Sequence, residues 1–283
     1  MRIAVTGAAG QVGRALQAVA PEFGMQIVPL TSADLDVSDA DAVLAMLPDL
    51  RPDCIIHAAA MTDTDGCETQ GERAYAVNAH SAGYVAEAAR RIGCPVIAIG
   101  TNYVFDGVRD APYDEFDAPN PCSVYARSKY AGELAAVRTG AQVMIVRTSM
   151  VYAEEGKNFL RTMLALSERG IPLKVVADQW GQPTYAADLA HGLLTLAQHP
   201  IAGTYHLTNT GRASWADWAF AAWKLAGRTV EATRVPASAF PRLCVPPTNG
   251  VLLNRAAAAL GVTLPPWEDG LRRCLTVMGH LVA

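Results

Sequence analysis

The feature that most constrains the fold is a short β-branched run that leads straight into a glycine-rich loop. Residues 2–6 read RIAVT and residues 6–13 read TGAAGQVG, which spaces Gly7, Gly10 and Gly13 three apart. A helical pattern over 11–20 begins inside the same loop. In dinucleotide-binding sheets, glycines at such a turn let the backbone approach a pyrophosphate, and the helix N-terminus offers free N–H groups. The alternative is a glycine-rich turn without a ligand.

Strand and helix patterns alternate through the first half of the chain. Apolar runs separated by amphipathic stretches are typical of parallel strands covered by helices on both faces. We therefore predict an α/β fold, a Rossmann-like doubly wound parallel sheet with a smaller C-terminal substrate-binding lobe. Residues 1–150 are expected to form the NAD(P)-binding domain, and residues 151–283 mainly the lobe, interleaved with the sheet edge. The predicted strands are 2–6, 25–30, 54–60, 95–100 and 141–149, and the predicted helices are 11–20, 41–50, 72–91 and one that carries 125–137.

Composition and charge exclude several classes of protein. The net charge is −4 without a long basic run, which argues against a nucleic-acid partner. No window approaches the roughly 18 unbroken apolar residues of a membrane span, and the N-terminal residues lack the pattern of a signal peptide. The six cysteines are scattered without C-x-x-C spacing, so we expect reduced thiols, no metal site and a cytoplasmic location.

The second predicted strand carries the signal for the type of dinucleotide. An acidic residue at its end would bind the ribose 2′-OH of NADH, but the strand ends in PLTS. The sequence therefore favours NADPH, with NADH as the alternative, and Arg14 is a candidate cation for the 2′-phosphate. Asp36 could bind the adenine amino group or cap the following helix.

Three side chains in the middle of the chain fit one proton-transfer mechanism. Thr101 stands at the end of the predicted fourth strand, where ligands bind in parallel sheets. Tyr125 and Lys129 lie four residues apart and share a helix face. A nearby ammonium, together with the nicotinamide charge, would move the tyrosine pKa toward neutral pH, and Thr101 would polarise a carbonyl oxygen. The alternatives are a turn-capping threonine and a solvated helix surface.

The chain resembles the extended short-chain dehydrogenase/reductase family over nearly its whole length. The resemblance rests on motifs such as TNYVFDG, VYARSKYAGE, VRTSMVYAEEGKNF and DQWGQPTY. It implies NAD(P)H-dependent reduction of the 4-keto group of a nucleotide-activated deoxysugar, with dTDP-4-dehydro-L-rhamnose the favoured substrate. The implied roles are pyrophosphate contact by Gln11 and Val12, adenine contact by Asp36 and Val37, a ribose and phosphate wall of Ala60, Met61 and Thr62, and a catalytic trio of Thr101, Tyr125 and Lys129.

The chain departs from the family pattern at three places that concern the substrate. Asn102 replaces the aspartate that usually follows the catalytic threonine, and Met150 replaces a tryptophan that stacks on the nucleotide base. The segment that begins at Pro246 lacks the usual arginine. Asn102 and Met150 remain the expected substrate contacts. A reductase of another nucleotide sugar or carbonyl substrate is one alternative, and a non-catalytic NADP-binding regulatory subunit is another. The protein is expected to be a monomer or homodimer.

Several residues are expected to be structural despite their chemistry. His57 and His206 lie in apolar strands and are interpreted as core histidines. Asp63 and Asp65 occur in a D-x-D-G fragment that lacks the remaining ligands of a calcium loop, so a solvated turn is expected.

Overall fold

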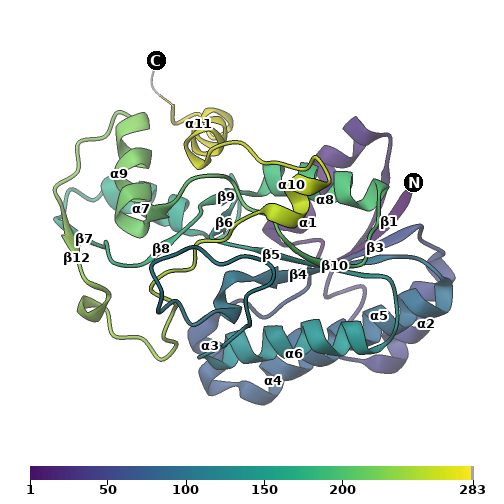
Figure 1. Cartoon of the computed structure of the whole chain (residues 1–283). Coiled ribbons are helices and arrows are strands. Elements are labelled where there is room, and N and C mark those ends of the chain that lie inside the picture. The colour runs from purple at the N-terminus through teal and green to yellow at the C-terminus, as the bar shows by residue number, and fades with distance from the viewer. Residues whose placement is uncertain (282–283) are drawn as a thin grey trace.

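A six-stranded parallel sheet forms the centre of the molecule (Figure 1). The computed structural model describes residues 1–281. The strand order is β10-β5-β4-β3-β1-β2, and every neighbouring pair is parallel. The order reverses between β1 and β3, and ligands bind outside the carboxyl ends of strands at such a switch point. The predicted α/β fold with a parallel sheet is confirmed.

The elements follow one another along the chain with these bounds. The strands are β1 (Arg2–Thr6), β2 (Gln26–Leu30), β3 (Cys54–His57), β4 (Val96–Thr101), β5 (Val143–Thr148), β6 (Val151–Tyr152), β7 (Leu173–Val176), β8 (Trp180–Gly181), β9 (Thr184–Tyr185), β10 (Gly203–His206), β11 (Ala213–Ser214) and β12 (Ala232–Val235). The α-helices are α1 (Gln11–Val19), α2 (Ala40–Leu50), α3 (Thr64–Thr69), α4 (Gly71–Tyr75), α5 (Ser81–Ile92), α6 (Val124–Arg138), α7 (Phe159–Ser167), α8 (Ala186–Gln198), α9 (Trp215–Leu225), α10 (Arg255–Ala259) and α11 (Trp267–Val277). Short 3₁₀ turns are η1 (Ala20–Phe23), η3 (Asn102–Val104) and η4 (Ala237–Ala239), and η2 (Ala76–His80) is a π-helical turn.

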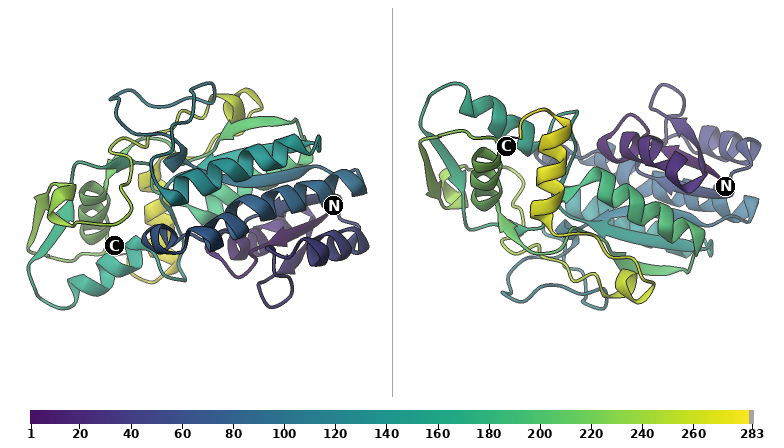
Figure 2. Two further views of the ribbon diagram at one scale, coloured as in Figure 1. Left: turned by 90° about the horizontal axis from the view of Figure 1, so that it is seen from below. Right: turned by 90° about the horizontal axis from the view of Figure 1, so that it is seen from above.

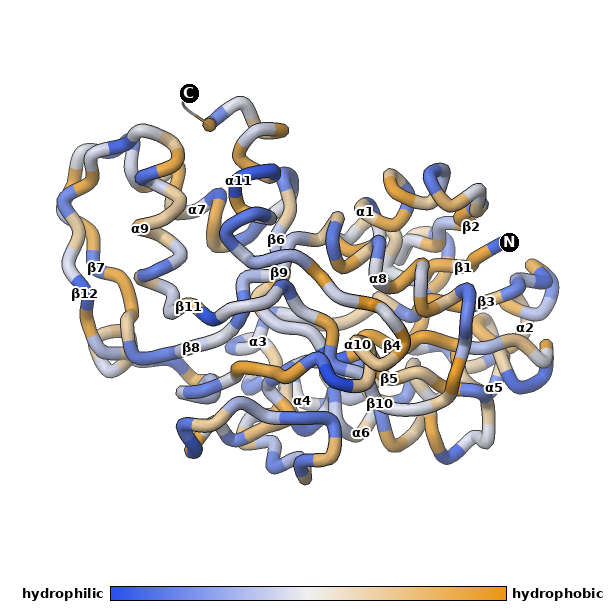
Figure 3. Tube along the Cα trace, turned by 45° about the horizontal axis from the view of Figure 1, so that its top comes forward, coloured by the Kyte–Doolittle hydropathy of each residue, from blue (hydrophilic) through white to orange (hydrophobic). Residues whose placement is uncertain are grey.

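Helices cover both faces of the sheet. On one face, α1 and α8 pack side by side over a core that includes Ile3, Leu16 and Leu193. On the other face, α2, α5 and α6 cover a core that includes Val43 and Val85. The tube is coloured as hydrophobic along β1, near the N-terminus, and along β4 (Figure 3). Burial on both faces explains why these strands read as continuous apolar runs.

The second half of the chain contributes to two parts of the molecule. Strand β10 pairs with β5 and extends the central sheet, and α8 lies against α1. The short helix α10 packs against β10, whereas α7, α9 and the β7–β12 pair form a smaller lobe beside the sheet (Figure 2). Its aromatic core includes Tyr152, Trp218 and Trp267.

Two glycines of the first loop stand where no other residue fits. Gly7 has φ +68°, and a Cβ there would lie 2.6 Å from the Ala59 backbone nitrogen. A Cβ on Gly13 would lie 2.5 Å from the Cα of Ala8. The glycine spacing therefore allows α1, the loop and the segment after β3 to pack backbone against backbone.

The structure differs from the predicted elements in three respects. The helix predicted over 72–91 is interrupted by η2, in which the Asn78 side chain bonds both the N–H (2.8 Å) and the carbonyl (3.1 Å) of Met61. The strand predicted to run to residue 60 ends at His57, because the next residues turn away to line a cavity. The prediction also lacked α7, α8, α9 and α11.

Both predicted core histidines are buried, as expected. The ring nitrogens of His57 lie 2.8 Å from Thr6 Oγ1 and 3.1 Å from Ser81 Oγ. Burial lowers the pKa of His57 to about 3, and the charge of Lys129 adds to this. Burial also lowers the pKa of His206 to about 3, with Arg147 acting in the same direction. Both side chains are therefore neutral at pH 7.

Because the pKa values of both buried histidines are lowered, we expect the protein to lose stability in mild acid. The unfolded chain binds protons near pH 6.5 and the folded chain only near pH 3, so stability present above pH 6.5 is lost as the pH falls. We expect the free energy of unfolding to fall by about 2 kcal/mol per histidine between pH 7 and pH 5. Urea denaturation at the two pH values measures this. His57→Gln should remove about half of the dependence, and equal stability at both pH values would contradict the prediction.

Candidate active site

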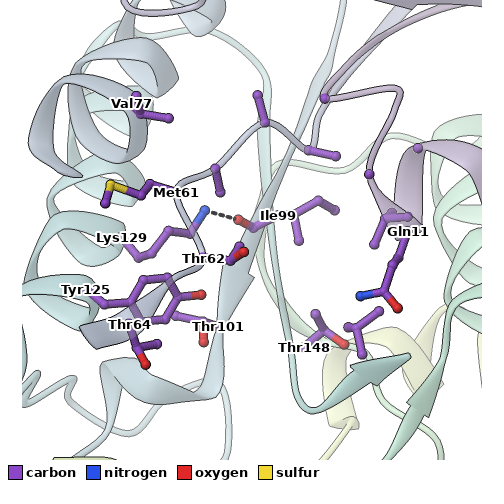
Figure 4. A pocket seen from close by; sticks show the side chains of 18 of the residues that line it. Gln11, Met61, Thr62, Thr64, Val77, Ile99, Thr101, Tyr125, Lys129 and Thr148 are labelled. Carbon is purple, nitrogen blue, oxygen red and sulfur yellow. Dashed lines mark hydrogen bonds between the residues drawn. The ribbon is translucent and has the colours of Figure 1, made fainter. Parts of the chain in front are cut away.

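One large cavity opens at the carboxyl ends of the sheet strands and extends toward the second lobe. Its volume is about 900 Å³. Figure 4 shows it from close by, with Gln11 on one side and Tyr125, Lys129 and Met61 on the other. Apart from Arg14, the structure brings the predicted site residues to this cavity, namely Gly7, Gly10, Gln11, Val12, Gly13, Asp36, Val37, Ala60, Met61, Thr62, Thr101, Asn102, Tyr125, Lys129 and Met150.

The glycine-rich loop forms one wall of the cavity. Gly10 precedes α1 in an extended conformation. Because glycine has no side chain, no side-chain cap bonds the first N–H groups of the helix. Gln11 is held by Asn158 of the second lobe, whose Nδ2 donates to Gln11 Oε1 at 3.0 Å. Backbone donors at the start of a helix suit a pyrophosphate.

The far end of the cavity has the features expected of an adenine and ribose site. Asp36 accepts hydrogen bonds from the Ser38 backbone N–H (2.9 Å) and hydroxyl (2.7 Å), which lower the pKa of its carboxyl. Arg73 also lines this cavity. Arg14, in contrast, lies outside the lining, with its Nε 3.9 Å from Glu155. The cation that the structure places in the cavity at this end is therefore Arg73 and not the predicted Arg14.

The predicted catalytic trio gathers on the opposite wall. Thr101 ends β4, Tyr125 and Lys129 come from consecutive turns of α6, and all three are largely buried. Thr101 Oγ1 accepts a hydrogen bond from the Tyr103 backbone N–H at 3.3 Å, and its hydroxyl also lies within hydrogen-bonding reach of Tyr125. Thr101 thus caps a turn and also lines the cavity, and its role toward a carbonyl oxygen stays a prediction.

Burial is the largest cause of the pKa shifts of Tyr125 and Lys129. It raises the pKa of Tyr125 to about 12, and hydrogen bonding to Thr101 acts in the opposite direction. The expected shift toward neutral pH is therefore not present in the protein alone, and Tyr125 carries its proton at pH 7. Burial lowers the pKa of Lys129 to about 8, while Glu133 raises it. Lys129 is mostly protonated at pH 7 and donates one hydrogen bond, 2.7 Å long, to the Ile99 carbonyl (Figure 4).

A buried ion pair lies behind Lys129. Glu133, one turn further along α6, accepts hydrogen bonds from Arg147 of β5 with a shortest distance of 2.7 Å. The side chains are 8% and 5% exposed, respectively. Arg147 pairs with Gly100 in the β4–β5 register. A Cβ on Gly100 would lie 2.8 Å from both Arg147 Cγ and Glu133 Oε1, so the glycine makes room for the pair.

The two predicted substrate contacts, Asn102 and Met150, each have a structural role. Asn102 Nδ2 donates to the Gly250 carbonyl at 3.0 Å, a bond that an aspartate carboxylate could not make. Met150 adopts φ +45° and packs beside the cluster that contains Tyr152 and Trp218. Pro246 lies outside the cavity lining. The amide at position 102 therefore connects β4 to the segment that follows Pro246.

The cavity also contains residues that the sequence patterns did not single out. Thr148 ends β5 opposite Thr101, and its buried hydroxyl has no hydrogen-bond partner among residues 1–281. Lys157, Phe159 and Trp215 extend the lining into the second lobe. The GKNF motif was a sequence signal for Lys157, but it indicated family membership without assigning a role.

The two aspartates considered as a metal loop have structural partners. Asp63 caps α3 by accepting a hydrogen bond from the Gly66 N–H at 3.1 Å, so the fragment starts a helix and is not an isolated turn. Asp65 forms a 3.0 Å ion pair with Arg242. Over the described part of the chain there is no group of three or more His, Cys, Asp or Glu side chains arranged for a metal ion. The same residues include no helix with the length and apolar character needed to cross a bilayer.

The parallel sheet, with the glycine-rich loop and Thr101, Tyr125 and Lys129 in one cavity, has the arrangement of the extended short-chain dehydrogenases/reductases. A narrower assignment follows from comparison with known families. Residues 1–279 match the model described as the RmlD substrate binding domain. The chain belongs to this family, which includes the dTDP-4-dehydrorhamnose reductases.

Individual relatives agree with this assignment over almost the full length. A dTDP-4-dehydrorhamnose reductase from Burkholderia thailandensis is 38% identical over 97% of this chain and 98% of its own. The spore coat polysaccharide biosynthesis protein SpsK of Bacillus subtilis is 35% identical over 97% of this chain and 96% of its own. A crystal structure of the dTDP-4-dehydrorhamnose reductase from Bacillus anthracis in complex with NADP has a TM-score of 0.93 and 36% identity, and covers 98% of this chain and 99% of that one.

Proposed function

We propose that the protein reduces the 4-keto group of dTDP-4-dehydro-L-rhamnose with NADPH and forms dTDP-L-rhamnose. The observation that carries the proposal is the meeting of Thr101, Tyr125 and Lys129 with the glycine-rich loop in one cavity. Relatives that are more than a third identical over nearly the whole chain are named as enzymes of this reaction. A further relative, 36% identical to this chain, was solved with NADP bound.

The cavity fits a dinucleotide in size and in the chemistry of its walls. The loop from Gly7 to Gly13 and the uncapped start of α1 suit a pyrophosphate, and Asp36 and Val37 line a site for adenine. Ala60, Met61 and Thr62 lie between that site and the trio, where a ribose and its phosphate would pass. When bound, NADPH supplies the hydride that reduces the carbonyl carbon.

The side chains of this protein supply the proton and position the oxygen. Tyr125, protonated at neutral pH, donates its proton to the carbonyl oxygen as that oxygen gains charge. The Thr101 hydroxyl turns its single proton to the same oxygen and still accepts from the Tyr103 N–H. Lys129 donates one of its three N–H groups to the Ile99 carbonyl. Its positive charge stabilises the phenolate that forms when Tyr125 loses its proton.

We further propose that the second lobe holds the sugar nucleotide and that the first 150 residues hold the cofactor. Asn102 and Met150 stand where the two parts meet at the cavity. A cytoplasmic location suits the cysteines, all six of which lie in the described residues as free thiols. The assembly is a monomer or homodimer.

A second candidate is reduction of another nucleotide sugar. Met150 lacks the flat ring of a tryptophan, and the Asn102 amide is engaged with Gly250, so two expected contacts to the substrate are altered. The comparison that separates the candidates is turnover of dTDP- and UDP-linked 4-keto-6-deoxysugars.

The first test of function is the loss of NADPH absorbance with dTDP-4-dehydro-L-rhamnose. We expect turnover, and a product that is dTDP-L-rhamnose by chromatography. Met150→Trp should lower KM for the dTDP-sugar several-fold, since it restores a stacking surface worth about 1 kcal/mol. NADPH binding without turnover of the dTDP-sugar would contradict the substrate assignment. Turnover of the UDP-sugar in that case would support the second candidate.

A further inference from the structure

A loop of the second lobe crosses over the glycine-rich loop of the first. Residues 153–158 connect β6 to α7, and Asn158 Nδ2 donates to Gln11 Oε1 at 3.0 Å. Glu155 lies 3.9 Å from Arg14 of α1. A Cβ on Gly156 would be only 3.0 Å from Arg14 Nη2, so the crossing is close. The loop therefore approaches the part of the cavity that suits a pyrophosphate.

Asn158 fixes the position of this crossing loop. Its Nδ2 also donates to the Ala153 carbonyl at 2.8 Å, which closes the loop on itself. Its Oδ1 accepts from the Arg161 N–H at 3.0 Å and caps α7. Lys157 is the preceding residue and lines the cavity. The contact of Asn158 with Gln11 thus holds the backbone of Lys157 over the glycine-rich loop.

The charges along the cavity show what Lys157 can do there. The cationic side chains in the lining are Arg73, Lys129 and Lys157. Arg73 bonds Gln70 and lies near Asp36, and Lys129 is committed to the trio. Lys157 is exposed and forms no ion pair within residues 1–281. The glycine-rich loop itself offers only backbone N–H groups, whereas a pyrophosphate brings negative charges that also favour a cation.

We propose that Lys157 binds the pyrophosphate of NADPH from the second lobe, positioned by the Asn158–Gln11 contact. The proposal rests on the proposed function, because it assumes the same dinucleotide in the same cavity. The cofactor pyrophosphate lies between the glycine-rich loop on one side and Lys157 on the other. The second lobe therefore takes part in binding the cofactor as well as the sugar nucleotide.

The test compares the affinities of wild type and Lys157→Gln for three ligands. Titration by the change in tryptophan fluorescence gives Kd for NADPH, NADH and dTDP. We expect Kd to rise about tenfold for both NADPH and NADH, by the same factor, as for loss of one charge-assisted contact to phosphate. Kd for dTDP should stay unchanged. The matched control is Lys174→Gln on β7, an exposed lysine outside the cavity lining, which should leave all three values unchanged.

Each other pattern of affinities contradicts the proposal. A loss for NADPH without a loss for NADH would assign Lys157 to the 2′-phosphate. A loss for dTDP alone would assign it to the pyrophosphate of the substrate, and no loss for any ligand would exclude both. Asn158→Ser adds a second measurement, because serine still caps α7 but cannot reach Gln11. It should weaken NADPH and NADH binding equally, and unchanged affinity would show that the contact does not position Lys157.

These outcomes separate the inference from the proposed function. Equal cofactor affinity of wild type and Lys157→Gln, with turnover intact, overturns the role of Lys157 alone. Wild-type protein that binds NADPH but does not reduce the sugar overturns the proposed function. In that case the comparison of Kd values still decides the role of Lys157.

Discussion

Tyr125→Phe is expected to reduce kcat for the dTDP-sugar by a factor of about 10² to 10⁴, the usual contribution of a positioned general acid. Phenylalanine keeps the ring that meets Tyr103 edge-on at 5.4 Å, so the fold and the cavity wall remain. It lacks the hydroxyl whose proton the carbonyl oxygen needs. The measurement is steady-state turnover together with NADPH titration, and Kd for NADPH should change by less than about twofold.

The neighbouring tyrosine provides the matched control. Tyr103 also lines the cavity, and burial raises its pKa as it does for Tyr125. Its backbone N–H, which the substitution keeps, is the group that contacts Thr101. Tyr103→Phe should therefore retain most of the activity. Comparable kcat values for Tyr125→Phe and wild type would show that the proton comes from another group.

Arg147→Met is expected to lower the free energy of unfolding by about 3–5 kcal/mol, because it leaves the Glu133 carboxylate buried without its partner. The pair is almost completely enclosed between α6 and β5, so water cannot replace the guanidinium. The substitution should also affect the active site, since the carboxylate of Glu133 raises the pKa of Lys129. Urea denaturation measures the stability, and the pH dependence of kcat/KM reports on Lys129.

The double variant Glu133→Leu/Arg147→Met is the control for this second prediction. Replacing both charges with apolar side chains removes the unpaired group, so the double variant should be more stable than Arg147→Met alone. Additive losses from the two single variants would contradict the idea that an isolated buried charge causes the damage. Arg273→Met, at a partly exposed pair with Asp188, should cost less than Arg147→Met.

Much of the cofactor half could be predicted because local patterns determine it. The run from Arg2 to Gly13 combines a strand, a glycine-requiring turn and a helix start, and the structure shows why Gly7 and Gly13 are needed. Tyr125 and Lys129 could be paired because one helix carries both. Thr101 could join them because the carboxyl ends of parallel strands share one edge.

The remaining features depend on contacts between distant segments, which local patterns do not contain. The π-helical turn at Asn78 forms because that side chain bonds the backbone of Met61. Lys157 reaches the cavity because Asn158 meets Gln11, 147 positions earlier in the chain. The Asn102 amide bonds Gly250, again across a long separation. The roles of the individual site residues stay predictions until the variants are measured.

The pairing of β10 with β5 has a consequence for how such proteins can diversify. Strand β10, which completes the sheet, comes after the first elements of the second lobe in the chain. Helix α8, from the same half of the chain, covers the sheet face that α1 also covers. A genetic crossover near residue 150 would give the recipient a foreign edge strand and a foreign covering helix along with the new lobe. Exchange of whole halves between relatives is therefore disfavoured, and new substrate preferences are expected to arise by point substitution around the cavity, at positions such as Met150.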